Sequence, residues 1–228
     1  MNIRLKLFLF SILISISCVV LAQSQTVSSN LSLDYLYDGK TTDLTVSYRA
    51  TDSFSDSVLV TGLGLRLHFD SSALQVGDVK NLFLDGAQGS SLNDDTSDVD
   101  NDTSTDKYFL TSWADFGGDW PDGENQPIVL YTLPFTALSG FNGSTLKFTA
   151  SSTAAGYTLE SDDISVLLDT VPPSISLIGS DIISLVGASY VDAGATALDN
   201  VDGDISDNIV STTYVDINSV GTYFVRYN

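Results

Sequence analysis

The sequence predicts an all-β protein made of two β-sandwich domains. Apolar residues alternate with polar ones along several short stretches, the pattern of strands that bury one face. Turn residues such as Asp38-Gly39, Asn142-Gly143 and Asp202-Gly203 recur roughly every 8–12 residues, a spacing typical of sandwiches and barrels. Helical periodicity is nearly absent after residue 22.

The first segment has the pattern of a secretory signal peptide over residues 1–22. Two basic residues, Arg4 and Lys6, precede an uncharged apolar run that ends at Ala22, where small residues favour cleavage. A membrane anchor is the alternative, but this run is shorter than the roughly 20 residues that span a bilayer. Lipidation of Cys18 is a further alternative, and the apolar run continues past it. We therefore expect a secreted protein.

The charge of the chain excludes whole classes of partner. The sequence has 29 acidic and 9 basic residues, and removal of the leader takes away Arg4 and Lys6. Such an acidic protein is repelled by nucleic acid and by anionic membrane surfaces. All but two of the acids are aspartates, which favour turns. The only cysteine lies in the leader, so core burial, alone or together with a metal ion, has to hold the mature chain together.

The first domain is predicted over residues 26–168. Strands are expected near 43–49, 62–69, 128–137 and 145–150. In the second of these, Leu63, Leu65, Leu67 and Phe69 should face the core, and His68 should point outward as a surface residue.

A second domain is predicted over residues 172–228. Pro172-Pro173 stiffens the chain and marks the boundary. Tyr223, Val225 and Tyr227 should form an edge strand at the end, and we expect this domain to be truncated because no turn follows that strand.

The second domain resembles the bacterial Ig-like domain first described in a pesticidal crystal protein. The residues that carry the resemblance are the Pro-Pro entry, the block YVDAGATALDNVDGDI and the ending VGTYFVRY. The resemblance implies an extracellular spacer or adhesion module without catalysis. The first domain is similar to cohesins, through FDSSALQV and LYTLPFTAL. That resemblance implies a jelly-roll sandwich that binds a protein or, in related folds, carbohydrate.

An acidic stretch, DVDNDTSTD, is the first candidate metal site. Asp98, Asp100, Asp102 and Asp106 are spaced like calcium ligands, with Asp94, Asp95 or Asp115 as a candidate further ligand. Thr103 replaces the usual turn glycine and Phe109 the closing glutamate, so weak calcium binding is expected. The alternative is a solvated acidic loop.

Two further candidates carry less weight. Asp199, Asp202 and Asp204 form a second acidic block, for which turn chemistry is the alternative to calcium. Trp120 is the aromatic expected to be exposed and able to stack on a sugar, whereas Trp113 is expected in the core.

The sequence offers little support for catalysis. His68 is the only histidine, and no G-x-S-x-G motif is present. The chain is therefore predicted to be a non-catalytic binding or adhesion protein of the bacterial surface or medium, with an extracellular protein or polysaccharide as its partner. The alternative is the carbohydrate-binding part of a larger secreted polysaccharide-degrading enzyme.

Overall fold

A computed structural model describes residues 23–52, 54–55, 57–122 and 125–228. Across these ranges the chain forms strands and one short 3₁₀ helix, η1 (Ser206–Asn208), and no α-helix, which confirms the all-β prediction. The predicted leader, residues 1–22, lies outside the described residues. Within the described ranges, no helix has the length and apolar character to cross a membrane.

The first large sheet has five strands in the order β10-β1-β3-β8-β5. Its strands are β1 (Ser24–Leu31), β3 (Thr41–Thr51), β5 (Leu74–Val76), β8 (Ile128–Ala137) and β10 (Thr158–Ser161). The N-terminal strand β1 lies inside the sheet, antiparallel to β3 on one side and parallel to β10 on the other.

The second large sheet has six strands in the order β2-β11-β9-β4-β7-β6. Its strands are β2 (Tyr35–Leu36), β4 (Gly62–Phe69), β6 (Ala87–Asp94), β7 (Lys107–Ala114), β9 (Ser144–Ser152) and β11 (Ile164–Leu168). Strand β6 is the exposed edge, and the long connection from β6 to β7 holds the acidic stretch.

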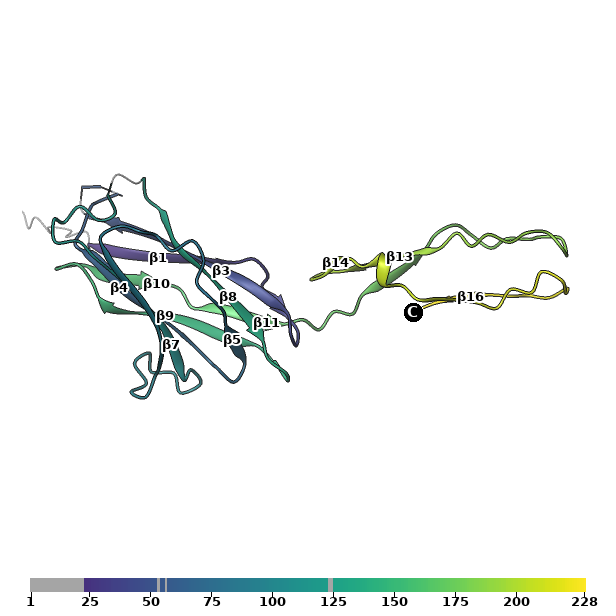
Figure 1. Cartoon of the computed structure of the whole chain (residues 1–228), viewed down its shortest axis with the longest axis horizontal. Coiled ribbons are helices and arrows are strands. Elements are labelled where there is room, and N and C mark those ends of the chain that lie inside the picture. Colours follow the sequence, from purple (N-terminus) through teal and green to yellow (C-terminus); the bar gives the residue numbers. More distant parts are fainter. Residues whose placement is uncertain (1–22, 53, 56, 123–124) are drawn as a thin grey trace, which may run out of the picture.

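The core lies between these two sheets (Figure 1). Leu63, Leu65, Leu67 and Phe69 of β4 are at most 1% exposed, which confirms the core face predicted for this strand. The Phe69 ring meets Phe135 of β8 edge to face at 5.5 Å between centroids, so the two sheets interlock. All four predicted strands are present, each extended by zero to two residues at its ends.

One buried polar side chain ties both sheets together. Gln25 of β1 is 0% exposed, and its Nε2 donates to the Tyr48 hydroxyl at 2.8 Å and to the Gly62 carbonyl at 2.9 Å. Its Oε1 accepts from the Ala154 backbone N–H at 2.8 Å. A buried amide is stable here because its donors and acceptor all have partners.

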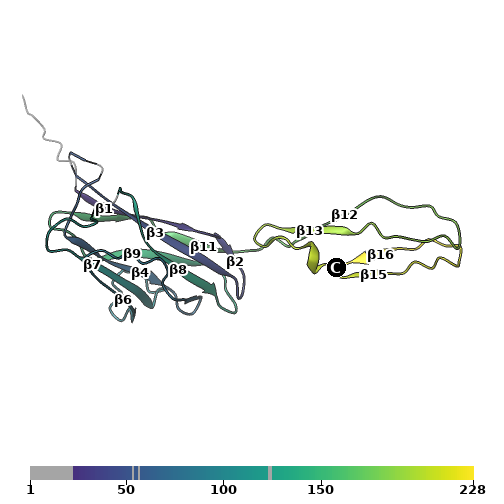
Figure 2. The same cartoon turned by 45° about the horizontal axis from the view of Figure 1, so that its top comes forward.

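The chain after residue 173 forms two small sheets that extend away from the sandwich (Figures 1 and 2). One has the order β12-β13-β14 and the other pairs β15 with β16. The strands are β12 (Ser174–Leu177), β13 (Ala195–Asp199), β14 (Gly203–Asp204), β15 (Ser211–Thr213) and β16 (Val225–Tyr227). Val225 and Tyr227 pair with β15 as predicted, whereas Tyr223 lies outside the strand.

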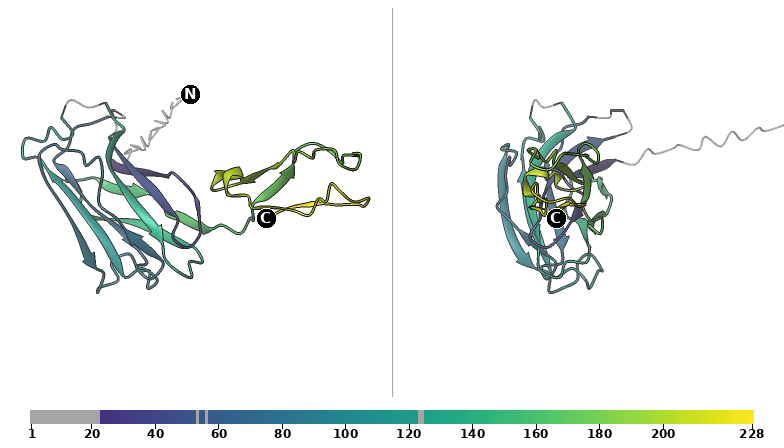
Figure 3. Two further views of the ribbon diagram at one scale, coloured as in Figure 1. Left: turned by 45° about the vertical axis from the view of Figure 1, so that its right-hand side comes forward. Right: turned by 90° about the vertical axis from the view of Figure 1, so that its right-hand side faces the viewer.

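The right view of Figure 3 looks along the molecule from the end where the small sheets join the sandwich. Polar contacts bridge the two parts at this joint. The Lys40 ammonium lies 2.6 Å from Asp202 Oδ1, and the Tyr37 hydroxyl donates to the same carboxylate at 3.0 Å. Asn200 Nδ2 donates to Asp169 Oδ1 at 3.2 Å.

Candidate functional site

The acidic stretch folds back over the outer face of the six-stranded sheet. It connects β6, which ends at Asp94, to β7, which begins at Lys107. Its carboxylates contact His68 of β4 and Lys147 of β9. Because β7, β4 and β9 are consecutive strands of the sheet, the loop reaches from the edge hairpin across two neighbouring strands. We call residues 95–106 the acidic loop.

The exposure predicted for His68 is wrong. The alternation along β4 does place this side chain on the outer face, opposite Leu67 and Phe69. The acidic loop covers that face, however, and leaves His68 0% exposed. The sequence pattern identified the face but gave no sign of what lies on it.

His68, Asp95 and Asp100 form a buried cluster beneath the loop. His68 Nδ1 lies 2.8 Å from Asp95 Oδ2 and 3.9 Å from Asp100 Oδ1, and both carboxyl side chains are 1% exposed. His68 Nε2 lies 2.8 Å from the Thr149 hydroxyl on β9. The ring therefore has a hydroxyl at one nitrogen and two carboxylates at the other.

The two carboxylates are also held by their own loop. The Val99 backbone N–H donates to Asp95 at 3.2 Å, and the Thr105 hydroxyl donates to Asp100 Oδ2 at 2.9 Å. Thr105 is itself buried. The loop thus fixes both carboxylates from above while the sheet fixes the imidazole from below.

A cation neutralises the next carboxylate along the loop. Lys147 Nζ lies 2.8 Å from Asp102 Oδ2. The Lys147 hydrogen bond, together with hydrogen bonds from Ser104, holds the pKa of the Asp102 carboxyl well below its usual range. The same contact raises the pKa of the Lys147 ammonium. The negative charge of this loop is therefore partly balanced by Lys147 on the sheet.

The four predicted calcium ligands point to different partners. Asp100 belongs to the buried cluster, Asp102 pairs with Lys147, and Asp106 accepts from the Ser71 hydroxyl at 2.6 Å and from its backbone N–H at 2.7 Å. Burial raises the pKa of the Asp106 carboxyl, but the Ser71 hydrogen bonds outweigh it and the pKa is lowered. Asp98 is exposed, with a φ of 49°. Calcium binding by these four residues stays a prediction.

The further ligands suggested by the sequence also separate. Asp95 joins the buried cluster, Asp94 pairs with Lys107, and Asp115 accepts from the Gly117 and Asp119 backbone N–H groups. Within the described ranges, one group of three histidine, cysteine or acidic residues has its possible metal-ligand atoms within 4.8 Å of one another. This group consists of His68, Asp95 and Asp100.

The second acidic block adopts turn contacts. Asp199 Oδ1 accepts from the Val201 and Asp202 backbone N–H groups at 2.8 and 2.9 Å. Asp204 Oδ1 accepts from the Ser206 backbone at 3.0 Å, while Asp202 contacts Lys40 across the joint. Calcium at this block likewise stays a prediction.

The exposure predicted for Trp120 is wrong. Its ring is 0% exposed and packs against Tyr48 at 4.7 Å and Trp113 at 5.8 Å between centroids. Trp113 is buried, as predicted. A ring without an exposed face cannot stack on a sugar, so the aromatic basis for carbohydrate binding at Trp120 is removed. Phe116, in the segment between β7 and Trp120, is the aromatic residue that is exposed there, at 99%.

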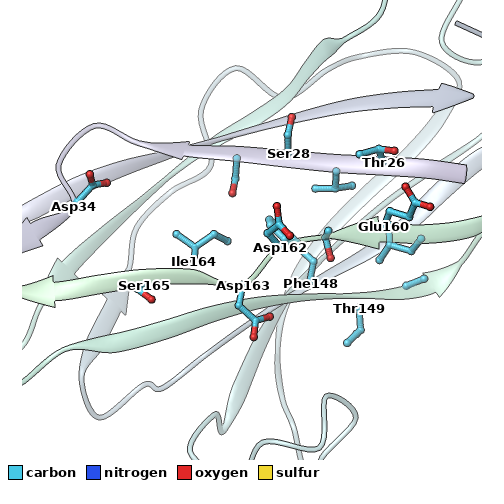
Figure 4. Close-up of a pocket in the computed structure, with 15 residues that line it drawn as sticks. Thr26, Ser28, Asp34, Phe148, Thr149, Glu160, Asp162, Asp163, Ile164 and Ser165 are labelled. Carbon is cyan, nitrogen blue, oxygen red and sulfur yellow. The ribbon is translucent and has the colours of Figure 1, made fainter. Parts of the chain in front are cut away.

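A shallow groove of about 930 Å³ lies at the seam between the two large sheets (Figure 4). Strands β1 and β10 line one side, and β9 and β11 the other, with Glu160, Asp162 and Asp163 at its rim. Phe148 and Thr149 of β9 both line this groove, and the Thr149 hydroxyl also lies 2.8 Å from His68 Nε2. The groove and the buried cluster therefore share Thr149 as a neighbour.

The contacts of His68 partly match those of a catalytic histidine. Thr149, His68 and Asp95 follow the order of hydroxyl, imidazole and carboxylate found in hydrolase triads. A general base must come within hydrogen-bond reach of a substrate proton. His68 is 0% exposed and both ring nitrogens already have partners, so this arrangement holds the loop and does not present the ring to a substrate.

Comparisons with known proteins bear on each part separately. The family model described as bacterial surface protein, Ig-like domain, matches residues 175–228, which confirms the resemblance indicated for the second domain. No curated protein matches the chain.

Solved structures similar to the N-terminal part include cohesin modules. The sixth cohesin of scaffoldin B from Acetivibrio cellulolyticus, solved with a Cel5 dockerin, has 11% identity and a TM-score of 0.43, and the match covers 65% of this chain and 100% of that one. The seventh ScaB type I cohesin from Pseudobacteroides cellulosolvens has 12% identity and a TM-score of 0.42, with 65% and 95% covered. A cohesin module of a family 33 glycoside hydrolase from Clostridium perfringens has 12% identity and a TM-score of 0.42, with 65% and 97% covered.

Proposed function

We propose that this chain is a secreted, non-catalytic binding or adhesion protein of the bacterial surface. In this proposal residues 1–22 are a leader, residues 26–168 form the binding module, and residues 172–228 belong to an Ig-like spacer. The observation that carries the proposal is the match of residues 175–228 to an Ig-like domain of bacterial surface proteins, directly after a separate sandwich. The strong acidity fits a protein partner and disfavours nucleic acid.

The part of the outer face of the six-stranded sheet beside the acidic loop offers the better candidate binding face, because Arg66, Tyr108, Leu110 and Ser112 are only partly buried. The Arg66 guanidinium lies 5.6 Å from the centre of the Tyr108 ring, and Arg66 is fixed by a 2.8 Å hydrogen bond to the Ala150 carbonyl. Leu110 and Ser112 follow Tyr108 on the same face of β7. Tyrosine and arginine dominate the energetics of protein interfaces, and prepositioned side chains lose little entropy on binding. The outer face of β1 and β3 in the other sheet carries mainly serine and threonine.

A binding experiment separates this function from the alternatives. The purified chain would be applied to a panel of extracellular proteins and to insoluble cellulose, chitin and xylan. We expect saturable binding to a protein that is weakened at least about tenfold by Leu110→Glu, because a buried interface charge is costly. Val129→Glu is the matched control, because Val129 is an exposed apolar residue on a strand of the other sheet.

Three outcomes would replace the proposal. Binding to a polysaccharide alone would favour the carbohydrate-binding part of a larger enzyme. Equal weakening by Leu110→Glu and Val129→Glu would show that the six-stranded face is not the interface. Hydrolysis of any panel substrate, lost in His68→Gln, would show that the chain is an enzyme.

We also propose that calcium stiffens the acidic loop, as the spacing of Asp98, Asp100, Asp102 and Asp106 suggests. Extracellular calcium modules bind at about 10⁻⁴–10⁻³ M, and binding to the folded state raises stability by mass action. Thermal unfolding in calcium should then give a higher midpoint than in magnesium at equal ionic strength. The double variant Asp100→Asn/Asp102→Asn should lose that difference. Identical midpoints in all three samples would leave the loop as a solvated, ion-paired cover.

A further inference from the structure

The buried cluster places two carboxyl groups beside one imidazole. His68, Asp95 and Asp100 have side-chain exposures of 0%, 1% and 1%. Removing two carboxylates from water costs several kcal/mol per ion unless a positive charge compensates. Lys147, the nearby loop-binding cation, pairs with Asp102 and not with either buried carboxylate.

The imidazole presents Nδ1 to both carboxylates. Nε2 is occupied by the Thr149 hydroxyl at 2.8 Å, the type of outer contact that fixes the orientation of a metal-bound histidine. Nδ1 then faces Asp95 Oδ2 at 2.8 Å and Asp100 Oδ1 at 3.9 Å. Three possible ligand atoms therefore converge on one point, which either a hydrogen-bonding proton or a metal ion can occupy.

The spacing of these three atoms suits a small divalent ion. A tetrahedral zinc site with bonds of about 2.0–2.1 Å to nitrogen and oxygen separates neighbouring ligand atoms by about 3.3 Å. The two distances from Nδ1, 2.8 and 3.9 Å, lie on either side of that value. An imidazole ligand favours zinc and its neighbours in the first transition row, whereas calcium takes oxygen ligands.

We propose that His68 Nδ1, Asp95 and Asp100 form a structural binding site for a divalent transition-metal ion of the zinc type. The ion takes the place of a proton on Nδ1, and the neutral imidazole then carries its proton on Nε2, where it can be donated to the Thr149 hydroxyl. Two of its ligands belong to the acidic loop and one to β4, so the ion fastens the loop to the sheet. This site goes beyond the proposed function, and it differs from the predicted calcium site in using His68.

The test uses the chain stripped with a chelator and then titrated with Zn²⁺, and separately with Co²⁺, whose visible absorption reports nitrogen and oxygen ligation. We expect one zinc ion per chain and a cobalt spectrum that zinc abolishes. Asp95→Asn and His68→Gln should weaken zinc binding by well over tenfold. Thr149→Val should weaken it about 10- to 100-fold, as is usual for partners that orient a metal ligand.

Asp102→Asn is the matched control, because Asp102 lies in the same loop but binds Lys147. It should leave zinc affinity unchanged while weakening any effect of calcium. Circular dichroism of each variant checks that the sandwich is folded. The proposal is overturned if the unmodified chain binds no zinc or cobalt saturably, or if folded Asp95→Asn and His68→Gln bind zinc as tightly as Asp102→Asn. Zinc binding is measured independently of partner binding, so the metal-site proposal and the proposed binding function can each fail without the other.

Discussion

At the scale of single residues, the buried aromatic cluster makes a direct stability prediction. Trp120 packs against Tyr48 and Trp113 and is 0% exposed. Trp120→Ala should lower the free energy of unfolding by about 3–5 kcal/mol, because a large core side chain leaves a cavity. Phe116→Ala, at a ring that is 99% exposed, should change it by no more than about 0.5 kcal/mol. Urea unfolding measures both, and equal losses would contradict the packing described.

The ion pair between Asp102 and Lys147 predicts a dependence of stability on pH. The pKa of Asp102 is lowered in the folded state, chiefly by the Lys147 hydrogen bond. A carboxyl with a lowered folded pKa stabilises the protein above its unfolded pKa, about 3.9, and loses that contribution as the pH falls through the folded value. Asp102→Asn should therefore destabilise the chain at pH 7 and progressively less below about pH 4.

The size of this effect should be modest. The Asp102 side chain is 23% exposed, and pairs in contact with solvent contribute about 0.2–1 kcal/mol. Urea unfolding of the unmodified chain and of Asp102→Asn at several pH values measures the difference. A difference that stays constant down to pH 2 would show that the pair does not titrate as described.

At the scale of strands, close backbone packing predicts the effect of one glycine. Gly62 begins β4 with a φ of 119°, and a Cβ there would lie 2.1 Å from the Trp113 carbonyl oxygen of β7. Gly62→Ala should disrupt the start of the β4–β7 pairing. Gly118 has a φ of 80° but no atom within 4 Å of an added Cβ, so Gly118→Ala carries only the conformational penalty.

We therefore expect Gly62→Ala to cost more than Gly118→Ala, and more than about 1 kcal/mol. Thermal unfolding shows which variant loses more stability, and hydrogen exchange of the β4 and β7 amides shows whether the loss is at the pairing of these two strands. If the two variants have the same midpoint, the close approach of β4 and β7 is not a constraint.

The strands could be predicted from the sequence, whereas the position of the acidic loop over β4 could not. Alternation is local, so it identified β3, β4, β8 and β9 and the core face of β4. The acidic loop covers His68 because its Asp95 meets His68 of β4 and its Asp102 meets Lys147 of β9, although these partners lie far apart in the sequence. Spacing along the chain suggested calcium, whereas pairing of the strands decides which carboxylates meet the imidazole. Trp120 was misjudged for the same reason, since its acidic neighbours in sequence are not its neighbours in space.

At the scale of the whole molecule, the joint between the sandwich and the small sheets should be restrained by a few exposed contacts. Asp202 binds Lys40 and Tyr37, and Asn200 binds Asp169. Exposed pairs are weak and screened by salt, and domains joined by a short linker move unless a larger interface holds them. Asp202→Ala should widen the range of orientations while it leaves the unfolding of the sandwich unchanged.

Small-angle scattering and residual dipolar couplings would measure this change. Asp204→Ala is the control, because Asp204 contacts only Ser206 within its own turn among the hydrogen bonds described. The unmodified chain in 1 M salt should approach the behaviour of Asp202→Ala. Unchanged couplings in the variant would show that the Pro172-Pro173 segment alone fixes the orientation.

The position of β1 determines when the sandwich can be completed during synthesis. This strand, the first in the chain, pairs on one side with β10, which ends at Ser161. Ribosomes add about 5–20 residues per second, so Val27 waits several seconds or more before its partner exists. Until then the edge of β1 that β10 will occupy is open to pairing with other chains. Completion of the sandwich is therefore a late event, and a chaperone or a translocation channel would have its longest access to this first strand.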